Sequence, residues 1–250
     1  MLSKEEIIKL KSSLGFNLGQ LEKDYLQHLF LLFLSRHLKN ELVFKGGTAL
    51  QKAHGLNRFS EDLDFTLNME MNLDELIGKI KKDIENFGFK AEYKVLSSKI
   101  SKCYRLRIKG PLYDGTERSI ASLRIEISLR KDIFLEPDAK EIIPAYADLQ
   151  PYIVLIMNAE EILAEKIRAI FQREKARDVY DLWILLKKGI KINYALVEKK
   201  AEFYNIKFNK NSFLKRISRM KKIWKEELSG YVSFIPDFNK VFIGIKEYVE

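Results

Sequence analysis

The spacing of apolar and polar residues changes along this chain from a mixed pattern to a helical one. Ser3 and Glu6 form a capping-box pattern that begins a short helix, and the apolar positions from about 18 to 38 predict a long, largely buried helix. The pattern then predicts, in order, a strand at 42–44, a helix at 48–56, a strand at 62–67 and an amphipathic helix at about 73–87. Helices and strands therefore alternate in this part of the chain.

Three further strands are expected at about 91–97, 102–109 and 119–130. The stretches "RLRIKG" and "LRIEISLR" alternate cleanly and place these residues on one apolar face: Leu106, Ile108, Leu123, Ile125, Ile127 and Leu129. Beyond Asn158 the pattern is almost entirely helical. We therefore expect an α+β protein in which a mixed sheet with flanking helices is followed by a helical C-terminal region, with domains at 1–150 and 151–250.

Composition adds a few constraints to this picture. The chain of 250 residues is 46% hydrophobic and carries a formal net charge of +9, which favours a polyanionic partner such as nucleic acid or a nucleotide. The single cysteine, Cys103, excludes an internal disulfide and a zinc site built from cysteines. The start "MLSKEEIIKL" has charges where a signal peptide has an apolar core, and "LFLLFL" at 29–34 is too short to span a bilayer. We expect a soluble cytoplasmic protein without a membrane partner.

Gly46, Gly47 and Thr48 lie between the strand at 42–44 and the helix that follows it. Glycines allow a backbone to approach a ligand closely, and the N–H groups at a helix N-terminus suit phosphate oxygens. The stretch is not a Walker A loop, because the Gly-Lys-Ser/Thr ending is missing, and it lacks the third glycine of a dinucleotide fingerprint. It predicts either a phosphate cradle or a tight turn in which Thr48 is the helix N-cap.

The stretch "SEDLDF" carries two carboxylates one residue apart. In a strand, Asp62 and Asp64 project from one face while Leu63 and Phe65 enter the core from the other. Two neighbouring carboxylates repel each other unless a cation lies between them, and hard oxygen ligands suit Mg²⁺ or Mn²⁺. The alternative is a solvated edge strand with incidental acidic residues.

Glu126 supplies a possible third carboxylate on the polar face of "LRIEISLR". If its strand neighbours the aspartate strand in one sheet, the three carboxylates provide what two-metal phosphoryl or nucleotidyl transfer requires. The competing interpretation is an ion pair between Glu126 and an exposed arginine.

Four stretches occur in the order "FKGGTAL", "RFSEDLDF", "EEILAEKIRAI" and "RDVYDLW". In these stretches the chain resembles the AbiEii-type nucleotidyltransferase toxins of phage abortive-infection systems, which belong to the DNA-polymerase-β-like nucleotidyltransferase superfamily. The resemblance covers roughly residues 25–190. It implies a minimal nucleotidyltransferase fold with an attached helical region, Mg²⁺ dependence, a nucleoside triphosphate donor, and a cognate antitoxin in a two-gene toxin–antitoxin pair.

The resemblance also implies roles for individual positions. Gly46, Gly47 and Thr48 match the Gly-Gly-Ser/Thr element, and Ser60, Asp62 and Asp64 match the Ser-x-Asp-x-Asp element. Lys166 matches the motif lysine of the first long C-terminal helix, and Asp178 matches the acid of the Arg-Asp-x-x-Asp element. Glu126 stands where many members of the superfamily carry Asp.

The two late motifs each allow a structural and a functional interpretation. Lys166 either is a solvated helix lysine near Glu160, Glu161 and Glu165, or places its ammonium over a cleft as a point charge for a triphosphate. Arg177 and Asp181, four residues apart, can form an ordinary helix ion pair. In the functional interpretation Asp178 lies near Lys166, holds it in place and keeps it charged.

Other polar residues have similar alternatives. Ser60 is either a turn hydroxyl that caps the entry to the strand or a phosphate contact beside the metal site. Several basic residues either line a path for RNA or form a solvated, charged sheet face; they are Arg105, Arg107, Lys109, Arg124 and Arg130.

Together these patterns predict a Mg²⁺-dependent nucleotidyltransferase that transfers a nucleoside monophosphate from a triphosphate to an acceptor. Gly46, Gly47 and Thr48 bind the triphosphate, Lys166 and Lys45 neutralise its charge, and Asp62 and Asp64 hold the metals. A single-stranded RNA 3′-end is the expected acceptor, since it suits a short cleft in a basic protein. The alternatives are a catalytically silent module that binds RNA or an antitoxin, and a phosphotransferase that moves the γ-phosphate.

Overall fold

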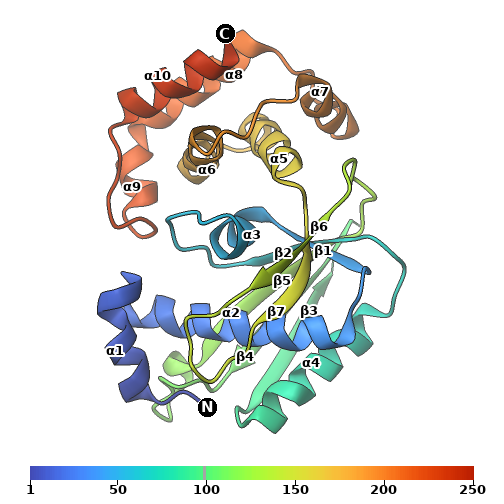
Figure 1. The fold of residues 1–250 in the computed structure, drawn as a ribbon, viewed down its shortest axis with the longest axis vertical. Coiled ribbons are helices and arrows are strands. Elements are labelled where there is room, and N and C mark those ends of the chain that lie inside the picture. Colours follow the sequence, from blue (N-terminus) through green and yellow to red (C-terminus); the bar gives the residue numbers. More distant parts are fainter. Residues whose placement is uncertain (98–99) are drawn as a thin grey trace. The chain divides into compact units, whose positions relative to one another are not determined.

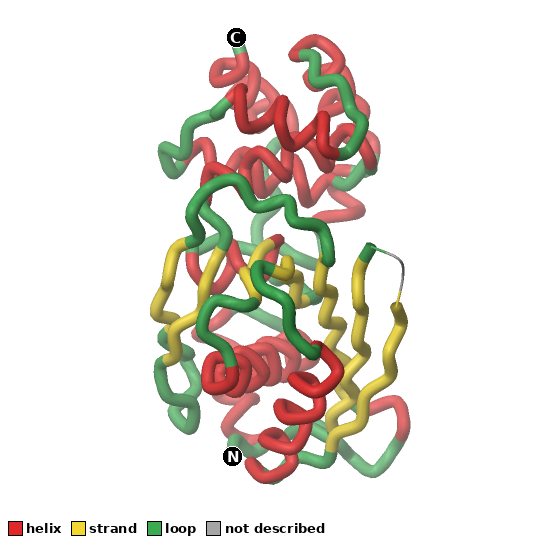
Figure 2. The backbone as a smooth tube through the Cα atoms, turned by 90° about the vertical axis from the view of Figure 1, so that its right-hand side faces the viewer, coloured by secondary structure: helices red, strands yellow, loops and turns green. Residues whose placement is uncertain are grey.

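The computed structural model describes residues 1–97 and 100–250, which form two compact units (Figure 1). The first unit comprises Met1–Ala53, Phe59–Lys131 and Pro137–Ile156. The second comprises His54–Arg58, Asp132–Glu136 and Met157–Glu250. Strands gather in the first unit, whereas the second is built from helices and loops (Figure 2).

A seven-stranded mixed sheet forms the centre of the first unit, in the order β3-β4-β5-β2-β1-β7-β6. The strands are β1 (Leu42–Lys45), β2 (Leu63–Leu67), β3 (Ala91–Ser97), β4 (Ser101–Ile108), β5 (Ala121–Ser128), β6 (Asp138–Ile142) and β7 (Tyr152–Ile156). The β2–β5 and β1–β7 pairs are parallel and the other pairs are antiparallel. Parallel neighbours require a crossover connection, so the chain between β2 and β5 contains a helix and a hairpin.

The helices of the first unit pack against this sheet or against one another. They are α1 (Lys4–Leu14), α2 (Leu18–His37), α3 (Gly46–Ala53) and α4 (Leu73–Phe87), with a short 3₁₀ turn, η1, at Glu117–Ser119. The predicted capping box of Ser3 and Glu6 is present, and a second one joins Asn17 to Gln20 at the start of α2. The buried α2 contacts β5 and β7, while α4 contacts β3 (Figure 1).

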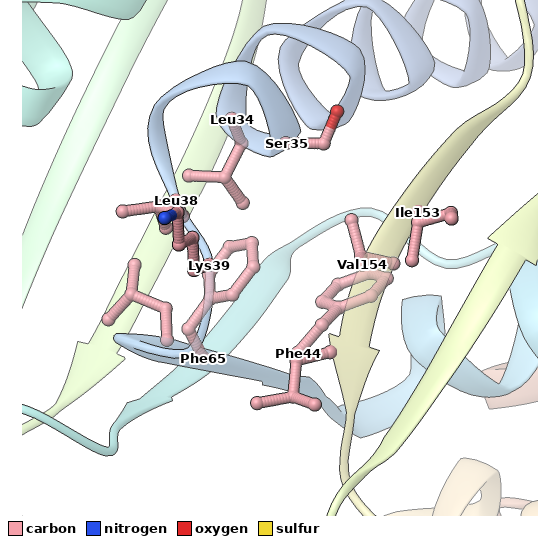
Figure 3. Close-up of a pocket in the computed structure, with 10 residues that line it drawn as sticks. Leu34, Ser35, Leu38, Lys39, Phe44, Phe65, Ile153 and Val154 are labelled. Atoms are coloured by element: carbon pink, nitrogen blue, oxygen red, sulfur yellow. The ribbon is translucent and has the colours of Figure 1, made fainter.

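A small apolar pocket lies on the face of the sheet that α2 covers. Leu34 of α2 and Leu38, which directly follows this helix, line it together with Phe44 and Phe65 from neighbouring strands (Figure 3). Because side chains alternate along a strand, Phe44 faces α2 whereas the next residue, Lys45, projects from the opposite face. The polar face of the sheet is therefore separate from this pocket.

The second unit consists of helices around its own apolar core. They are α5 (Ala159–Gln172), α6 (Ala176–Lys187), α7 (Tyr194–Phe203), α8 (Lys210–Arg219), α9 (Trp224–Leu228) and α10 (Phe238–Val249), with a 3₁₀ turn, η2, at Met220–Lys222. The buried Lys200 of α7 pairs with Glu161 and Glu165 of α5, at 2.8 and 3.2 Å. A buried ammonium requires such partners, so this ion-pair group fastens α7 to α5.

The fold class predicted from the sequence is confirmed, and most predicted elements lie within a few residues of their expected bounds. The strand pattern missed β6 and β7, which are five residues each. The helix expected to reach residue 56 ends at Ala53, before Gly55, whose φ of 59° lies in the left-handed region. Among the described residues, no helix is long and apolar enough to cross a bilayer.

Candidate functional site

At the junction of β1 and α3 the backbone of Gly46 lies against the carboxylate of Asp64. Gly46 has a φ of 74°, a conformation that residues with a side chain rarely adopt. A Cβ atom at this position would lie 3.1 Å from the Cγ of Asp64 and closer still to its carboxylate oxygen. Position 46 therefore requires glycine for both its backbone conformation and its space, because the Asp64 carboxylate lies directly over it.

Hydrogen bonds from two helices hold the segment that leads to the aspartates. The buried hydroxyl of Thr48 in α3 donates to the carbonyl oxygen of Asp62 at 2.5 Å. The N–H of Ser60 donates to Gln51 Oε1 at 2.8 Å, and Gln27 Nε2 donates to the Ser60 carbonyl at 2.9 Å. The side chain of Thr48 thus fixes the backbone of Asp62. Ser60 is buried, and its backbone is held by Gln51 and Gln27.

Strand register places three charged residues in one row across the sheet. Lys45 of β1 is the Cα partner of Asp64 in β2, and Asp64 is the Cα partner of Glu126 in β5. Paired residues in neighbouring strands project to the same face. The condition under which Glu126 can join the aspartates, that its strand neighbours theirs in one sheet, is therefore met.

The two aspartates face away from the core, as the alternation predicts. Leu63 and Phe65 are buried, whereas Asp62 and Asp64 are partly exposed. Asp62 directly precedes β2, which begins at Leu63. Two carboxylates that reach solvent beside a glycine turn provide hard oxygen donors of the type that Mg²⁺ prefers.

Glu126 is engaged by a neighbouring arginine. Arg124 Nη2 lies 2.7 Å from Glu126 Oε2, and the two side chains are 50% and 40% exposed. Within the described residues, no group of three or more His, Cys, Asp or Glu side chains is arranged to hold a metal ion. Asp62 and Asp64 therefore fit a divalent cation in donor type, while Glu126 would have to leave Arg124 to join them.

Arg124 lies within the electrostatic field of several groups on this face. The pKa of its guanidinium is raised, first by the neighbouring Cys103 side chain and then by the carboxylates of Glu126 and Asp62. Its charge reduces the repulsion between the carboxylates of the site. Arg124 thus stabilises the arrangement in which it holds Glu126.

Lys166, in the second unit, is buried in a group of charged side chains. Only 6% of the residue is exposed, and its Nζ lies 3.0 Å from Asp178 Oδ1 and 2.6 Å from Asp181 Oδ2. Burial opposes the charge of the ammonium, but Asp181 and Asp178 outweigh this effect and the pKa of Lys166 is raised. The contact expected between Lys166 and Asp178 is present, and Lys166 is not a solvated helix lysine.

Two residues that the sequence reasoning did not assign complete this charged group. Arg58 binds Asp181 through two hydrogen bonds, from Nε at 2.6 Å and from Nη2 at 2.7 Å, and both residues are buried. Arg173 binds Asp178 from Nε at 2.8 Å, and the pKa of Asp178 is well below its usual range because the charges of Lys166 and Arg173 outweigh the effect of burial. The alternative helix pair is not present among the described residues: Asp181 pairs with Arg58 and Lys166, and Arg177 lies over the Tyr231 ring at 4.8 Å.

A mixed sheet with a glycine turn and paired carboxylates on its polar face is typical of a nucleotidyltransferase. Comparison with family models then identifies the group: the model described as "Nucleotidyl transferase AbiEii toxin, Type IV TA system" matches residues 31–244. The chain belongs to this family of nucleotidyltransferase toxins, which implies an antitoxin partner and a nucleoside triphosphate substrate.

The chain is also similar to several solved structures. The chain is similar to JHP933 from Helicobacter pylori, with 25% identity, a TM-score of 0.60 and coverage of 94% of this chain and 91% of that one. A putative nucleotidyltransferase from H. pylori has 25% identity, a TM-score of 0.55, and coverage of 90% and 92%. MenT4, a nucleotidyltransferase toxin from Mycobacterium tuberculosis, shares the fold, with 19% identity, a TM-score of 0.65, and coverage of 100% and 89%. A search of curated proteins finds no match.

Proposed function

We propose that this protein transfers a nucleoside monophosphate from a nucleoside triphosphate to a hydroxyl group, and that the acceptor is an RNA 3′-end. The observation that supports this most directly is the row of Lys45, Asp64 and Glu126, with the Asp64 carboxylate directly over Gly46. A phosphate chain, its counter-ion and an attacking hydroxyl need this combination of close backbone, positive charge and carboxylates.

In this proposal the first unit binds the triphosphate. The turn at Gly46 and Gly47 brings the N-terminus of α3 toward the phosphates, and Lys45 neutralises part of their charge. Thr48 and Ser60 act on the position of Asp62 through the backbone bonds described above. Asp62 and Asp64 would hold Mg²⁺ or Mn²⁺, with Glu126 as a further ligand. The bound cation would polarise the α-phosphate and stabilise the departing pyrophosphate.

The proposed roles of Lys166 and Asp178 rest on the family match, whose range includes both residues. Their charged group contains three cations, Lys166, Arg58 and Arg173, against the carboxylates of Asp178 and Asp181. Cations outnumber carboxylates among these five side chains, and the Arg173 side chain is 58% exposed. A group with a surplus of positive charge is suited to a triphosphate, and Asp178 keeps the Lys166 ammonium fixed and protonated.

One observation favours a second candidate, a catalytically silent module that binds RNA or an antitoxin. Glu126 is held by Arg124, so the described residues do not present three assembled carboxylates. In such a module the polar face of the sheet would be a binding surface.

Labelled nucleotides distinguish these functions. The protein is incubated with total RNA and each of the four nucleoside triphosphates, labelled at the α-phosphate or at the γ-phosphate. Label from the α-position on RNA supports nucleotidyl transfer, and label from the γ-position would indicate a phosphotransferase. If a folded protein transfers neither label while an Asp64→Asn variant behaves identically, the silent module becomes the better description.

A further inference from the structure

Most of the net positive charge of this protein arises in one segment. Residues 207–225, "KFNKNSFLKRISRMKKIWK", contain eight lysines and arginines and no acidic residue. The whole chain has a formal net charge of +9, so the remaining residues together carry a net charge of +1. The basic character of the protein is therefore a property of one segment in the second unit, which we call the basic segment.

The basic segment turns its charges outward. It comprises α8, η2 and the start of α9, and its apolar residues Phe213, Ile217, Met220 and Trp224 are buried. Four exposed basic residues follow one another at intervals of four, three and three residues: Lys215, Arg219, Lys222 and Lys225. This spacing keeps side chains on a common side of a helical segment, so these four residues form a positive stripe.

Within the part of the chain that the structure describes, a carboxylate approaches only one member of this stripe. Arg219 approaches Glu174 at 4.0 Å, the outer limit of an ion pair. Within residues 1–97 and 100–250, Lys215, Lys222 and Lys225 form no ion pair with a carboxylate. By contrast, on the sheet face Arg107 pairs with both Glu92 and Glu117, and Arg124 pairs with Glu126. The stripe is thus more available to a polyanion than the strand that carries Arg107.

An exposed aromatic ring follows the basic segment. Phe234 is 81% exposed, in the loop between α9 and α10. This loop is fixed to α9, because Trp224 Nε1 donates to the Pro236 carbonyl at 2.8 Å and the Val232 N–H donates to the Leu228 carbonyl at 3.2 Å. Since Trp224 belongs to the basic segment, the exposed ring stands on a loop that is tied to this segment, and exposed aromatic rings of this kind can stack on unpaired bases.

We propose that the basic segment, together with Phe234, is the surface on which the RNA acceptor docks. Lys215, Arg219, Lys222 and Lys225 neutralise backbone phosphates, and Phe234 stacks on a base of a single-stranded stretch. The identity of the acceptor as RNA rests on the proposed function, but the docking itself requires no nucleotide transfer. It can therefore be measured separately.

The test compares RNA binding by two variants that each lose three positive charges. One carries Lys215→Gln, Arg219→Gln and Lys222→Gln in the stripe; the control carries Lys79→Gln, Lys82→Gln and Lys90→Gln, three exposed lysines of the first unit. The probe is a fluorescein-labelled RNA hairpin with a single-stranded 3′ tail, titrated from about 50 to about 200 mM salt. Thermal unfolding establishes that both variants are folded.

We expect the stripe variant to lose at least about tenfold in affinity at low salt and its slope of log K against log salt to fall by about 2, whereas the control stays close to wild type. A Phe234→Ala variant should lose roughly tenfold in affinity with an unchanged slope, because stacking releases no counterions. Replacing Lys215 and Lys222 by Arg should preserve binding, since the charge is kept.

Binding of a labelled triphosphate by the same proteins separates this inference from the proposed function. If the stripe variant binds RNA as wild type does, or if both triple variants lose affinity equally, the docking surface is wrong even when transfer is observed. If wild type binds the hairpin through the stripe but binds no triphosphate, the docking surface stands and the transfer activity fails. Wild type that binds a triphosphate and no RNA overturns the inference.

Discussion

The Asp64 carboxylate occupies the space that a side chain at position 46 would need. A Gly46→Ala variant should therefore lose about 1–2 kcal/mol of stability from its left-handed backbone alone, and displace Asp64 as well. Gly78→Ala in α4 is the matched control, because the nearest atom to a Cβ there is 4.0 Å away and alanine favours a helix. Thermal unfolding and triphosphate binding measure both effects. Equal behaviour of the two variants would contradict the arrangement at Gly46.

An Asp64→Asn variant tests the carboxylate without changing its shape. Because Asp64 is partly exposed and Asn is isosteric, the free energy of unfolding should change little, whereas nucleotide transfer should be lost. Asp62→Asn should behave alike. Transfer within a few-fold of wild type, in a variant that unfolds at the normal temperature, would remove both aspartates from the proposed metal site.

The charged group around Lys166 makes a separate stability prediction. Arg58→Ala leaves the buried Asp181 without its bidentate partner, which should cost about 3–5 kcal/mol. Arg177→Ala should change the stability far less, since Arg177 only packs over the Tyr231 ring. Chemical denaturation measures the free energy of unfolding of the two variants. A larger loss of stability in Arg177→Ala than in Arg58→Ala would mean that Arg177, not Arg58, is the main partner of Asp181.

Residue spacing explains why only part of this group could be predicted. Lys166 and Asp178 lie in two motifs that the resemblance already connects, and their contact was expected. Arg58 and Asp181 are 123 positions apart, and no local pattern links residues at that distance. The i, i+4 rule favoured Arg177 as the partner of Asp181, but burial of both Arg58 and Asp181 gave the tertiary pair precedence.

Between elements, the helix α2 is joined to β7 by a buried histidine. His28 Nδ1 is 2.8 Å from the Tyr152 hydroxyl, and burial followed by the charge of Lys52 lowers the pKa of His28 from 6.5 to about 3. Its imidazole is therefore neutral in the folded state. Below pH 6.5 the unfolded chain binds a proton that the folded chain does not, so stability rises with pH and is lost as the pH falls from 6.5 toward 3.

A His28→Gln variant separates this contribution from that of other groups. Wild type should lose up to about 1.4 kcal/mol per pH unit between about pH 6 and about pH 5, whereas the variant should show little change in this window. Denaturant unfolding at about pH 7, 6 and 5 measures both slopes. Parallel slopes in the two proteins would mean that His28 is not the group responsible.

The arrangement of strands was predictable where alternation was clean. The apolar faces of β4 and β5 gave their bounds within two residues, whereas the neighbourhood of β2 and β5 was only the condition under which Glu126 could join Asp64. The strands β6 and β7 were missed because each is five residues long and neighbours a turn-rich stretch, so few positions reveal a period of two. These two strands pair with each other and with β1, and such tertiary pairing leaves no local signal in the sequence.

At the scale of the whole molecule, the sequence predicted a mixed part and a helical part but did not show that short segments change units. Residues 54–58 and 132–136 belong to the second unit, although the chain on both sides of each belongs to the first. Contacts such as Arg58 with Asp181 determine this membership. Total charge likewise predicted a polyanionic partner, while its concentration in residues 207–225 becomes informative only when their exposure is known.

Binding of a divalent cation should be visible in the unfolding of the whole protein, independently of activity. A ligand that binds only the folded state stabilises it by about 2.7 kcal/mol at a concentration 100-fold above its dissociation constant. Mg²⁺ should therefore raise the unfolding temperature of wild type, and EDTA should reverse the rise and abolish transfer. An Asp62→Asn, Asp64→Asn double variant should not respond, because amides are poor ligands for a hard cation in place of paired carboxylates. Potassium chloride at equal ionic strength is the control for screening. An equal rise in the double variant would place the magnesium elsewhere, and transfer that persists in EDTA would exclude a metal-dependent mechanism.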